Sequence, residues 1–348
     1  MLAGAILVVE RSSPEHNAAR DSRGRMTDPG TLGGNPIACV ELLGQSVLDR
    51  LVQKLRHDGV GLITVVIKEE FSHLARMSAT PATTINTVAL QTDLWSAAEC
   101  VLREYVQHGV ELALLTRLGA YAELDLADLI RFHRDTTQGI TVLTKDREAM
   151  DSWIIEAGEA RNMRRLGLPQ LLYREDLRSA TPYALPGYVC RLDEPSDLRQ
   201  LVIDAFLSRC SIRPRGRELK PGVWVDDGAQ VHRRARIVAP AYLGSGAKLR
   251  ADTLVTRFST LERDCDVHDG TVIEDSSILA NTCVGKGLNV AHAVVDGNKV
   301  FPLRQQIVVE VQDSKLLGRT ATAELPRPVA GGVSGASLAE RLLATAWN

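Results

Sequence analysis

Charged and glycine residues follow the first apolar stretch of the chain, where a phosphate-bearing ligand could bind. Residues 5–9 (AILVV) are apolar, Glu10 follows them directly, and residues 11–34 are polar and rich in arginine and glycine. Arginine side chains and the backbone N–H groups of glycine-containing loops bind phosphate, so a phosphate clamp is one interpretation. A surface loop is the other, because polar runs of this composition commonly form one. The residues that a clamp would use are Arg20, Arg23, Arg25, Gly33 and Gly34.

Three histidines in the second half of the chain could act as general bases. His232 and His268 each follow an aliphatic residue of the repeat described below, so we expect their side chains to point outward. His292 lies after the regular repeat and is the best candidate of the three. A single outward histidine is more often a surface residue than a catalytic base, so the sequence assigns no catalytic residue here.

The six cysteines contain no CxxC pair and show no metal-ligand spacing with histidines. We therefore assign no metal ligand from the sequence. Cys265 and Cys283 are expected to lie side by side as small apolar residues rather than as a disulfide. This usage fits a reducing cytoplasm.

Strand and helix patterns alternate over roughly the first 210 residues. Alternation of this kind predicts a mostly parallel, Rossmann-like sheet covered on both faces, with its ligand beyond the carboxyl ends of the strands. The loop after residues 5–9 is the first such place. Strands are predicted at 5–9, 63–67, 110–115 and 140–143, and helices at 46–56, 94–106, 125–133 and 196–206.

An aliphatic residue recurs every six positions from Val225 onward, and a small residue follows each one after four places. Neither a helix nor a single strand has this period, which is typical of a coil of short parallel strands. Three strands per turn return the chain to the same corner after eighteen residues, so Val225, Leu243, Leu261 and Leu279 should form one inward column. The ten aliphatic positions are Val225, Val231, Ile237, Leu243, Leu249, Val255, Leu261, Val267, Ile273 and Leu279.

This repeat resembles the hexapeptide-repeat, left-handed β-helix family over residues 223–300. The segments before it resemble the sugar nucleotidyltransferases (NDP-sugar pyrophosphorylases), many of which carry such a β-helix behind the catalytic domain. The resemblance implies an enzyme that joins a sugar 1-phosphate to a nucleoside triphosphate with Mg²⁺. The segments that carry it are NPIACVELLGQSVLDRLVQKL (35–55), LITVVI (62–67), ELDLADLIRFHRD (123–135) and GYVCRLDEPSDLRQL (187–201).

The chain departs from this family at each position that carries charge in the reaction. The family's glycine-rich loop L-A-G-G-x-G-T-R is replaced by an apolar run ending in Glu10, and the lysine of P-K-P by Asn35. Alignment on residues 123–133 places Leu118 and Gly119 where the family has its first metal-binding aspartate, and alignment on Pro195 and Asp197 places Arg191 at the second one. A shift of a few residues would instead bring Asp125 or Asp193 to these sites. A phosphate site without these groups has little to stabilise the transition state, so a catalytically degenerate protein is predicted.

Composition sets the remaining limits. The chain has 348 residues, a net charge of −2 and 4% aromatic residues, which disfavours nucleic-acid binding. No apolar run has the length of a membrane span, and residues 2–9 lack the features of a signal peptide, so we expect a cytoplasmic protein. The predicted domains are a nucleotidyltransferase-like α/β domain (1–212), a linker (213–222), a left-handed β-helix (223–311), and a tail with a short C-terminal helix (312–348).

The sequence favours a regulatory or scaffolding subunit in sugar-nucleotide or polysaccharide metabolism. One alternative is an active nucleotidyltransferase with a remodelled phosphate loop, which would need Mg²⁺; otherwise no cofactor is predicted, and cofactor-binding residues are unknown. Another is an acyltransferase run by the hexapeptide repeat. A β-helix of few turns exposes strand edges, so we expect an oligomer, either with itself or with an active paralogue. A sugar nucleotide is a possible ligand.

Overall fold

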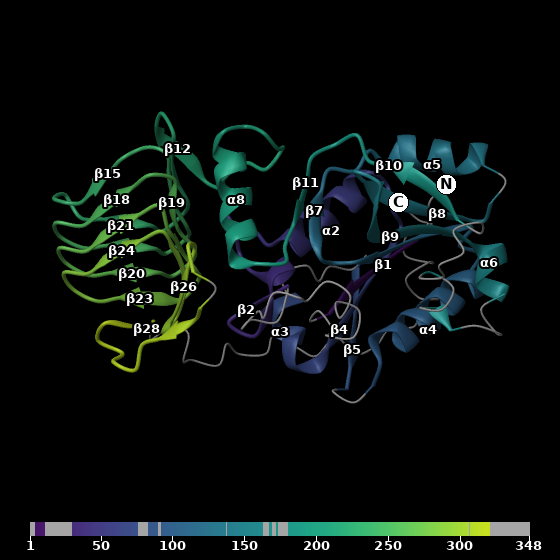
Figure 1. Cartoon of the computed structure of the whole chain (residues 1–348), viewed down its shortest axis with the longest axis horizontal. Helices are drawn as coiled ribbons and strands as arrows, with labels where there is room; N and C mark the ends of the chain where they lie inside the picture. The colour runs from purple at the N-terminus through teal and green to yellow at the C-terminus, as the bar shows by residue number, and fades with distance from the viewer. Residues whose placement is uncertain are drawn as a thin grey trace. The chain divides into compact units, whose positions relative to one another are not determined.

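The computed structural model describes residues 4–10, 30–75, 83–89, 92–136, 138–162, 167–168, 172, 180–305 and 307–320 (Figure 1). These residues divide into two compact units. The first holds the described residues of 1–10 and 48–189, and the second holds those of 11–47 and 190–328. Residues 30–47 therefore belong to the second unit, although they precede most of the first unit in the chain.

The first unit is built on a seven-stranded sheet with the order β10-β8-β9-β6-β1-β4-β5. The central strand β1 runs parallel to β4 and β6, and only β9 runs against its neighbours. The mixed α/β class with a mostly parallel sheet is thus confirmed. The strands are β1 (Gly4–Val9), β4 (Leu62–Lys68), β5 (Thr83–Val88), β6 (Leu112–Arg117), β8 (Ile140–Lys145), β9 (Glu148–Glu156) and β10 (Thr181–Ala184).

The reversed strand β9 was not predicted, because its direction depends on a tight turn. Asp146 and Arg147 between β8 and β9 both have positive φ, 51° and 68°. Two such residues in succession form the hairpin turn that matches the twist of antiparallel strands. Neither residue is glycine or asparagine, so the usual signal for this turn is missing.

The helices of the first unit cover a sheet whose central strand is buried at every position. Successive side chains of a strand point to opposite faces, so both faces of β1 are covered. Asp93 and Asp125 cap α4 and α5 by accepting hydrogen bonds from the backbone N–H groups of Ser96 and Asp128. The helices are α2 (Val47–His57), α3 (Ser72–Ala75), α4 (Leu94–Gln107), α5 (Leu126–Asp135) and α6 (Ala157–Asn162), with the 3₁₀ turn η2 (Glu69–Phe71); a second 3₁₀ turn, η1 (Ile37–Cys39), belongs to the second unit.

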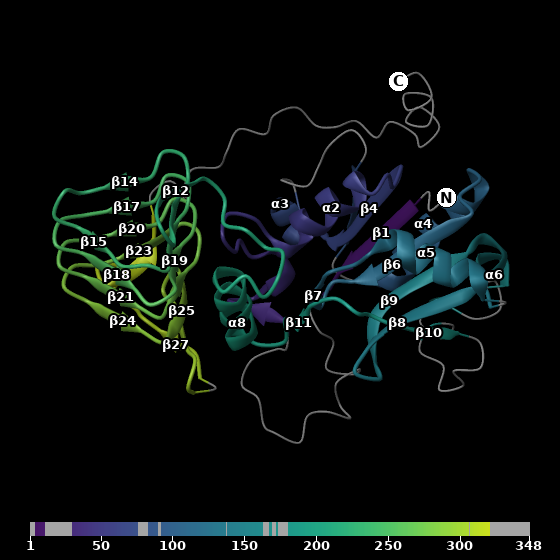
Figure 2. The ribbon, with the colours of Figure 1, turned by 90° about the horizontal axis from the view of Figure 1, so that it is seen from above.

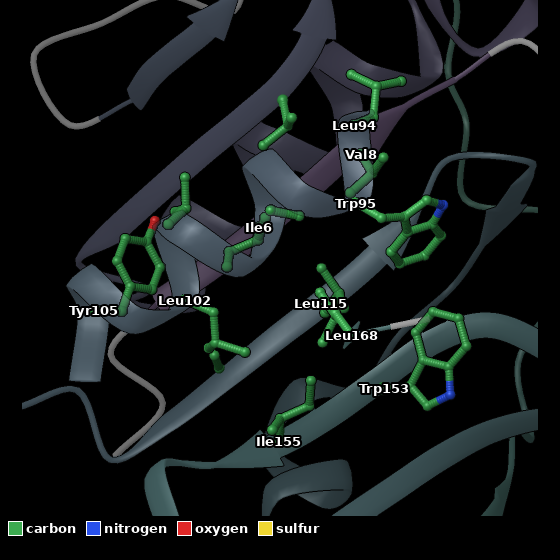
Figure 3. Packing of buried hydrophobic residues seen from close by; sticks show 14 of the residues in the cluster. Ile6, Val8, Leu94, Trp95, Leu102, Tyr105, Leu115, Trp153, Ile155 and Leu168 are labelled. Carbon is green, nitrogen blue, oxygen red and sulfur yellow. The ribbon is translucent and has the colours of Figure 1, made fainter. Parts of the chain in front are cut away.

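Helix α4 packs its buried residues against one face of this sheet (Figure 3). Its Trp95 meets Trp153 of β9 edge to face, with ring centroids 6.1 Å apart. Tyr105 near its end is buried, and its hydroxyl lies 2.8 Å from Thr64 Oγ1 of β4. Aliphatic residues fill the same cluster, among them Ile6 and Val8 of β1 and Leu94 and Leu102 of α4.

The second unit contains three sheets in which each strand pairs in parallel with the third strand after it (Figure 2). In the first two turns the register is eighteen residues: Val223 pairs with Ala241, and Ala241 with Ser259. The strands are β13 (Val223–Val225), β14 (Gln230–Val231), β15 (Arg236–Ile237), β16 (Ala241–Leu243), β17 (Lys248–Leu249), β18 (Leu254–Thr256), β19 (Ser259–Leu261), β20 (Asp266–Val267), β21 (Val272–Glu274), β22 (Ser277–Ile278), β23 (Thr282–Val284), β24 (Asn289–Ala291) and β25 (Ala293–Asp296). We call this part the three-sheet region.

The six-residue repeat correctly predicts the core of the three-sheet region. The aliphatic positions from Ile237 to Leu279 are all buried. In the first turn, however, Val225 is half-buried and Val231 is 41% exposed. Val231 lies on β14, which is the edge strand of its sheet, so no earlier turn covers it.

The third turn is one residue shorter than predicted. Leu261 pairs with Ile278 rather than Leu279, and Cys283 lies beside Asp266 rather than Cys265. The predicted cysteine stack is therefore wrong, and both thiols are free. The cause is a corner: the turn between β18 and β19 uses two residues of positive φ, Arg257 and Phe258, whereas the next turn uses only Asp275.

Antiparallel strands extend both ends of the three-sheet region. β12 (Arg217–Lys220) pairs with β13; β26 (Lys299–Pro302) and β27 (Val309–Glu310) follow β25; and β28 (Leu317–Arg319) pairs with β23. The hairpin β2 (Thr31–Leu32) and β3 (Asn35–Pro36), a two-stranded pairing of β7 (Ala120–Ala122) with β11 (Val189–Arg191), and α8 (Pro195–Phe206) complete the described elements. The predicted C-terminal helix lies outside the described residues. No helix within the described part of the chain has the length and apolar character needed to cross a membrane.

Candidate functional site

The carboxyl end of β1 is where the sheet topology favours a ligand. β1 lies between β4 and β6, so Glu10, the residue after β1, comes close to Arg117, the last residue of β6. Glu10 Oε2 lies 3.5 Å from Arg117 Nε, and Arg117 Nη1 lies 3.0 Å from Asp151 Oδ2 of β9. The Arg117 side chain is only 14% exposed. These three residues, Glu10, Arg117 and Asp151, form the carboxyl-edge triad.

The residues aligned with the first metal-binding aspartate do lie beside the end of β1. The Leu118 N–H donates to Val8 O over 2.9 Å, and the Leu118 side chain is buried. Gly119 follows it and carries no side chain. This position therefore lies beside the end of β1 and offers no carboxylate.

The residues present at this edge do not fit a Mg²⁺ ion. Mg²⁺ binds carboxylates in octahedral geometry, usually together with waters and substrate phosphates. Both carboxylates of the triad face the Arg117 guanidinium instead. Within the described residues, no group of three or more His, Cys, Asp or Glu side chains could hold a metal ion.

Lys68, at the carboxyl end of β4, is hydrogen-bonded to a neighbouring loop. Lys68 ends β4, and its Nζ donates to the carbonyl oxygens of Ala89, over 3.3 Å, and Thr92. These carbonyls belong to the connection between β5 and α4. Lys68 therefore stabilises the carboxyl edge of the sheet by joining the end of β4 to this connection.

The other residues aligned with the nucleotidyltransferase motifs lie in the second unit. Arg191, Asp193 and the 34–36 segment all belong to it, and the Gly30 N–H donates to Asp193 O over 2.8 Å. Asp125, the other carboxylate of a shifted alignment, caps α5. Arg20, Arg23 and Arg25 lie outside the described residues. The structure therefore does not bring the aligned residues together within either unit.

The segment with the nucleotidyltransferase resemblance is anchored to the three-sheet region by Glu262. This side chain is 1% exposed, and its two carboxylate oxygens accept the backbone N–H groups of Leu43, over 2.9 Å, and Gly44, over 3.0 Å. Beside it, Arg263 Nη2 lies 2.9 Å from Glu41. This contact was not predicted, because the sequence indicates it only by a glutamate immediately after the core residue Leu261.

His292 lies in a hydrogen-bonded chain with two charged residues, which we call the corner chain: Arg199, Asp275 and His292. His292 Nδ1 is 2.6 Å from Asp275 Oδ2, and Asp275 Oδ1 is 2.7 Å from Arg199 Nη2. Arg199, from α8, is 2% exposed and also donates to the carbonyls of Phe258, over 2.6 Å, and Arg257, over 3.1 Å. Burial raises the pKa of Asp275, but hydrogen bonds from Arg199 and His292 outweigh it and leave that pKa below its ordinary value.

The other two histidines make weaker contacts. His268 Nε2 lies 3.6 Å from Cys283 Sγ and 3.7 Å from Asp266 Oδ2. Burial raises the pKa of the Cys283 thiol, so this group is not an activated nucleophile. His232 is exposed, as predicted, and its Nδ1 accepts the Arg234 N–H over 3.2 Å.

Comparison with known proteins finds similarity among solved structures only. No family model matches the chain, and no curated protein matches it. Among solved structures, the chain is similar to HddC from Yersinia pseudotuberculosis, complexed with GMP-PN, with a TM-score of 0.41 and 11% identity. The similarity covers 56% of this chain and 96% of that one.

Proposed function

We propose that this chain is a nucleotidyltransferase-like protein that has lost catalysis and acts as a regulatory or scaffolding subunit in sugar-nucleotide or polysaccharide metabolism. It joins an α/β domain (1–212) through a linker (213–222) to a left-handed β-helix (223–311), followed by a tail (312–348). The observation that carries the proposal is the carboxyl-edge triad. In it, Glu10 and Asp151 form ion pairs with Arg117, the cation that a bound triphosphate would need.

The charge of the triad argues against phosphate binding. Two carboxylates and one guanidinium sum to −1, and a triphosphate is itself strongly anionic. Phosphoryl transfer depends on positioned cations that neutralise charge developing on the phosphate oxygens. Arg117 is committed to the two carboxylates, so its charge is largely neutralised before any ligand arrives.

Pyrophosphate release tests the proposal directly. Purified protein with Mg²⁺ should release no pyrophosphate from any nucleoside triphosphate with common sugar 1-phosphates. Steady turnover with any pair would overturn the proposal and support the active alternative, with a phosphate loop formed by residues 11–34.

A charge-removal variant makes the same test sharper. Glu10→Gln removes one negative charge of the triad, so nucleoside triphosphates should raise the Tm of this variant more than that of the wild type. Glu70→Gln, an exposed glutamate after β4, is the matched control and should behave as the wild type does. Equal shifts in all three proteins would show that Glu10 does not oppose phosphate binding.

A second candidate function, an acyltransferase that uses His292 as its base, is supported by one observation. Asp275 accepts from His292 Nδ1, which leaves Nε2 available for proton transfer at a side chain that is 34% exposed. Incubation with acetyl-CoA and amino-sugar acceptors, followed by thiol release, tests it. Activity that His292→Ala abolishes and His232→Ala leaves intact would support this function.

A further inference from the structure

One sheet of the three-sheet region has eight strands when its antiparallel extensions are included, in the order β12-β13-β16-β19-β22-β25-β26-β27. A row of apolar residues on its inward face continues from the buried core of the parallel strands onto β26 and β27. Each member pairs with the next across adjacent strands. The first four are buried, Val300 in β26 is half-buried, and Val309 in β27 is 42% exposed. The sheet therefore extends an apolar surface that the described part of the chain leaves uncovered at its last strand. The row is Leu243, Leu261, Ile278, Val295, Val300 and Val309.

The edge formed by β27 is apolar, whereas the opposite edge of the same sheet is charged. Ile307 and Val308 before β27 are 41% and 38% exposed, and Glu310 is the only charged residue in 307–311. At the other edge, three of the four residues of β12 are charged. Charged residues on an edge strand prevent strand addition, and an apolar edge without them invites it. Only the β27 edge has the composition of an interface.

Hydrogen bonds between β26 and β27 show which backbone groups of the β27 edge remain open to another strand. The Val311 N–H donates to Asn298 O over 2.8 Å, toward β26. Hydrogen-bonded and non-hydrogen-bonded pairs alternate in an antiparallel ladder, so Val309 also faces β26 and Glu310 faces the open side. By the same alternation, the backbone N–H and C=O groups of Val308 and Glu310 point away from β26, toward the open side of the sheet.

We propose that a second copy of this chain pairs with β27 in antiparallel fashion, about a two-fold axis at Val309. In this register Val308 of each copy exchanges backbone hydrogen bonds with Glu310 of the other, and the two Val309 side chains extend the inward row. Each Glu310 faces an apolar Val308, so the only charge in the segment does not meet its own copy. This inference rests on the proposed role as a subunit and assigns the surface through which the chain assembles.

Cysteine cross-linking tests the register. Residues opposite each other in a non-hydrogen-bonded pair have Cα atoms about 4.5 Å apart, which a disulfide can span. Val309→Cys should therefore form a covalent dimer on mild oxidation, seen on a non-reducing gel. Ile307→Cys is the matched control, because it is equally exposed but its copies would lie four residues apart along the strand, roughly 14 Å.

The wild type sets the background, because Cys100 is exposed. Cross-linking of Val309→Cys well above both the wild type and Ile307→Cys is the expected result. Equal cross-linking of the two variants, or none in either, would overturn the proposed register.

Light scattering on the full-length protein tests the surface itself. The wild type should be a dimer or a higher even oligomer at micromolar concentration, and Val309→Lys should halve its mass. Val238→Lys, which changes an exposed valine elsewhere in the three-sheet region, should leave the mass unchanged. A monomeric wild type would overturn the inference. An oligomer that survives Val309→Lys, or one that pairs only with another protein, would overturn the β27 interface and leave the proposed function standing.

Discussion

At the scale of single residues, His133 makes the stability of the first unit depend on pH. It is fully buried on α5, and its Nδ1 lies 2.7 Å from Thr141 Oγ1. Burial lowers its pKa, an effect that the nearby Glu156 only partly offsets. The unfolded chain therefore binds a proton at higher pH than the folded chain does. Stability is fully present above the ordinary histidine pKa of about 6.5 and is lost as the pH falls below it.

We predict that the free energy of unfolding falls between pH 7.5 and pH 5.5, and that His133→Gln reduces this dependence. Urea titrations at several pH values measure it. His57→Gln, at the exposed end of α2, is the control and should keep the wild-type slope. An unchanged slope in His133→Gln would mean that other groups cause the pH dependence.

Gly33 and Gly34 are adjacent glycines with similar backbone conformations, and only Gly33 lies close to the Asp296 side chain. Both have positive φ, 61° and 96°, which any other residue adopts with strain. A Cβ on Gly33 would clash with the Asp296 carboxylate, whereas one on Gly34 would meet no atom within 4 Å. Asp296 cannot move away easily, because it is buried and lies 2.7 Å from Arg319.

We therefore predict that Gly33→Ala destabilises the second unit by about 1–3 kcal/mol more than Gly34→Ala does. Thermal unfolding of the two variants measures the difference. Equal losses would mean that backbone strain alone limits both positions.

At the scale of elements, the sequence predicts the three-sheet region well, because each six-residue repeat places one inward aliphatic residue on each short strand. The same pattern cannot detect the shortened third turn. Ile278 and Leu279 are both aliphatic, so either one continues the column, and only the corner at Asp275 decides between them. The hairpin that reverses β9 is hidden for a similar reason, since Asp146 and Arg147 carry no turn signature.

The core of the three-sheet region can be tested at Leu261. Its side chain is fully buried in the inward row, so Leu261→Asp would place an unpaired charge among aliphatic residues. We predict loss of the cooperative unfolding transition of the second unit, measured by circular dichroism during heating. Val231→Asp is the control: Val231 is another aliphatic residue of the six-residue repeat, but it lies in the first turn and is 41% exposed, so this variant should unfold within a few degrees of the wild type. Similar losses in both variants would contradict the described core.

The candidate site was predicted less completely than the fold. The sequence predicts the strand that Glu10 follows, and the carboxyl ends of neighbouring parallel strands lie together, so Glu10 lies beside the end of β6. It does not predict the pairing of Arg117 with Asp151, which depends on the reversed β9. It also misses Arg199, whose partners are two backbone carbonyls and Asp275 in a distant part of the sequence.

At the scale of the whole molecule, residues 30–47 belong to a unit that begins again only at residue 190. Local sequence could not indicate this, because the segment resembles the start of an α/β domain and leads directly into α2. Glu262 supplies the physical reason, since it accepts two backbone N–H groups of this segment in a buried environment. Without that carboxylate, the buried Leu43 N–H and the half-buried Gly44 N–H would each lose this acceptor, at a cost of up to about 1–3 kcal/mol for a buried group.

We therefore predict that Glu262→Ala releases residues 40–46 from the three-sheet region while the parallel strands persist. Hydrogen–deuterium exchange should show lost protection at the amides of Leu43 and Gly44, with the amides of β18 and β21 unchanged. Glu262→Gln keeps one acceptor oxygen and should give an intermediate result. Glu274→Ala, which removes a partly exposed ion pair with Arg257 in the same region, is the control and should leave residues 40–46 protected. Protection of Leu43 and Gly44 that survives Glu262→Ala would mean that the Glu41–Arg263 pair and apolar packing hold the segment without the buried carboxylate.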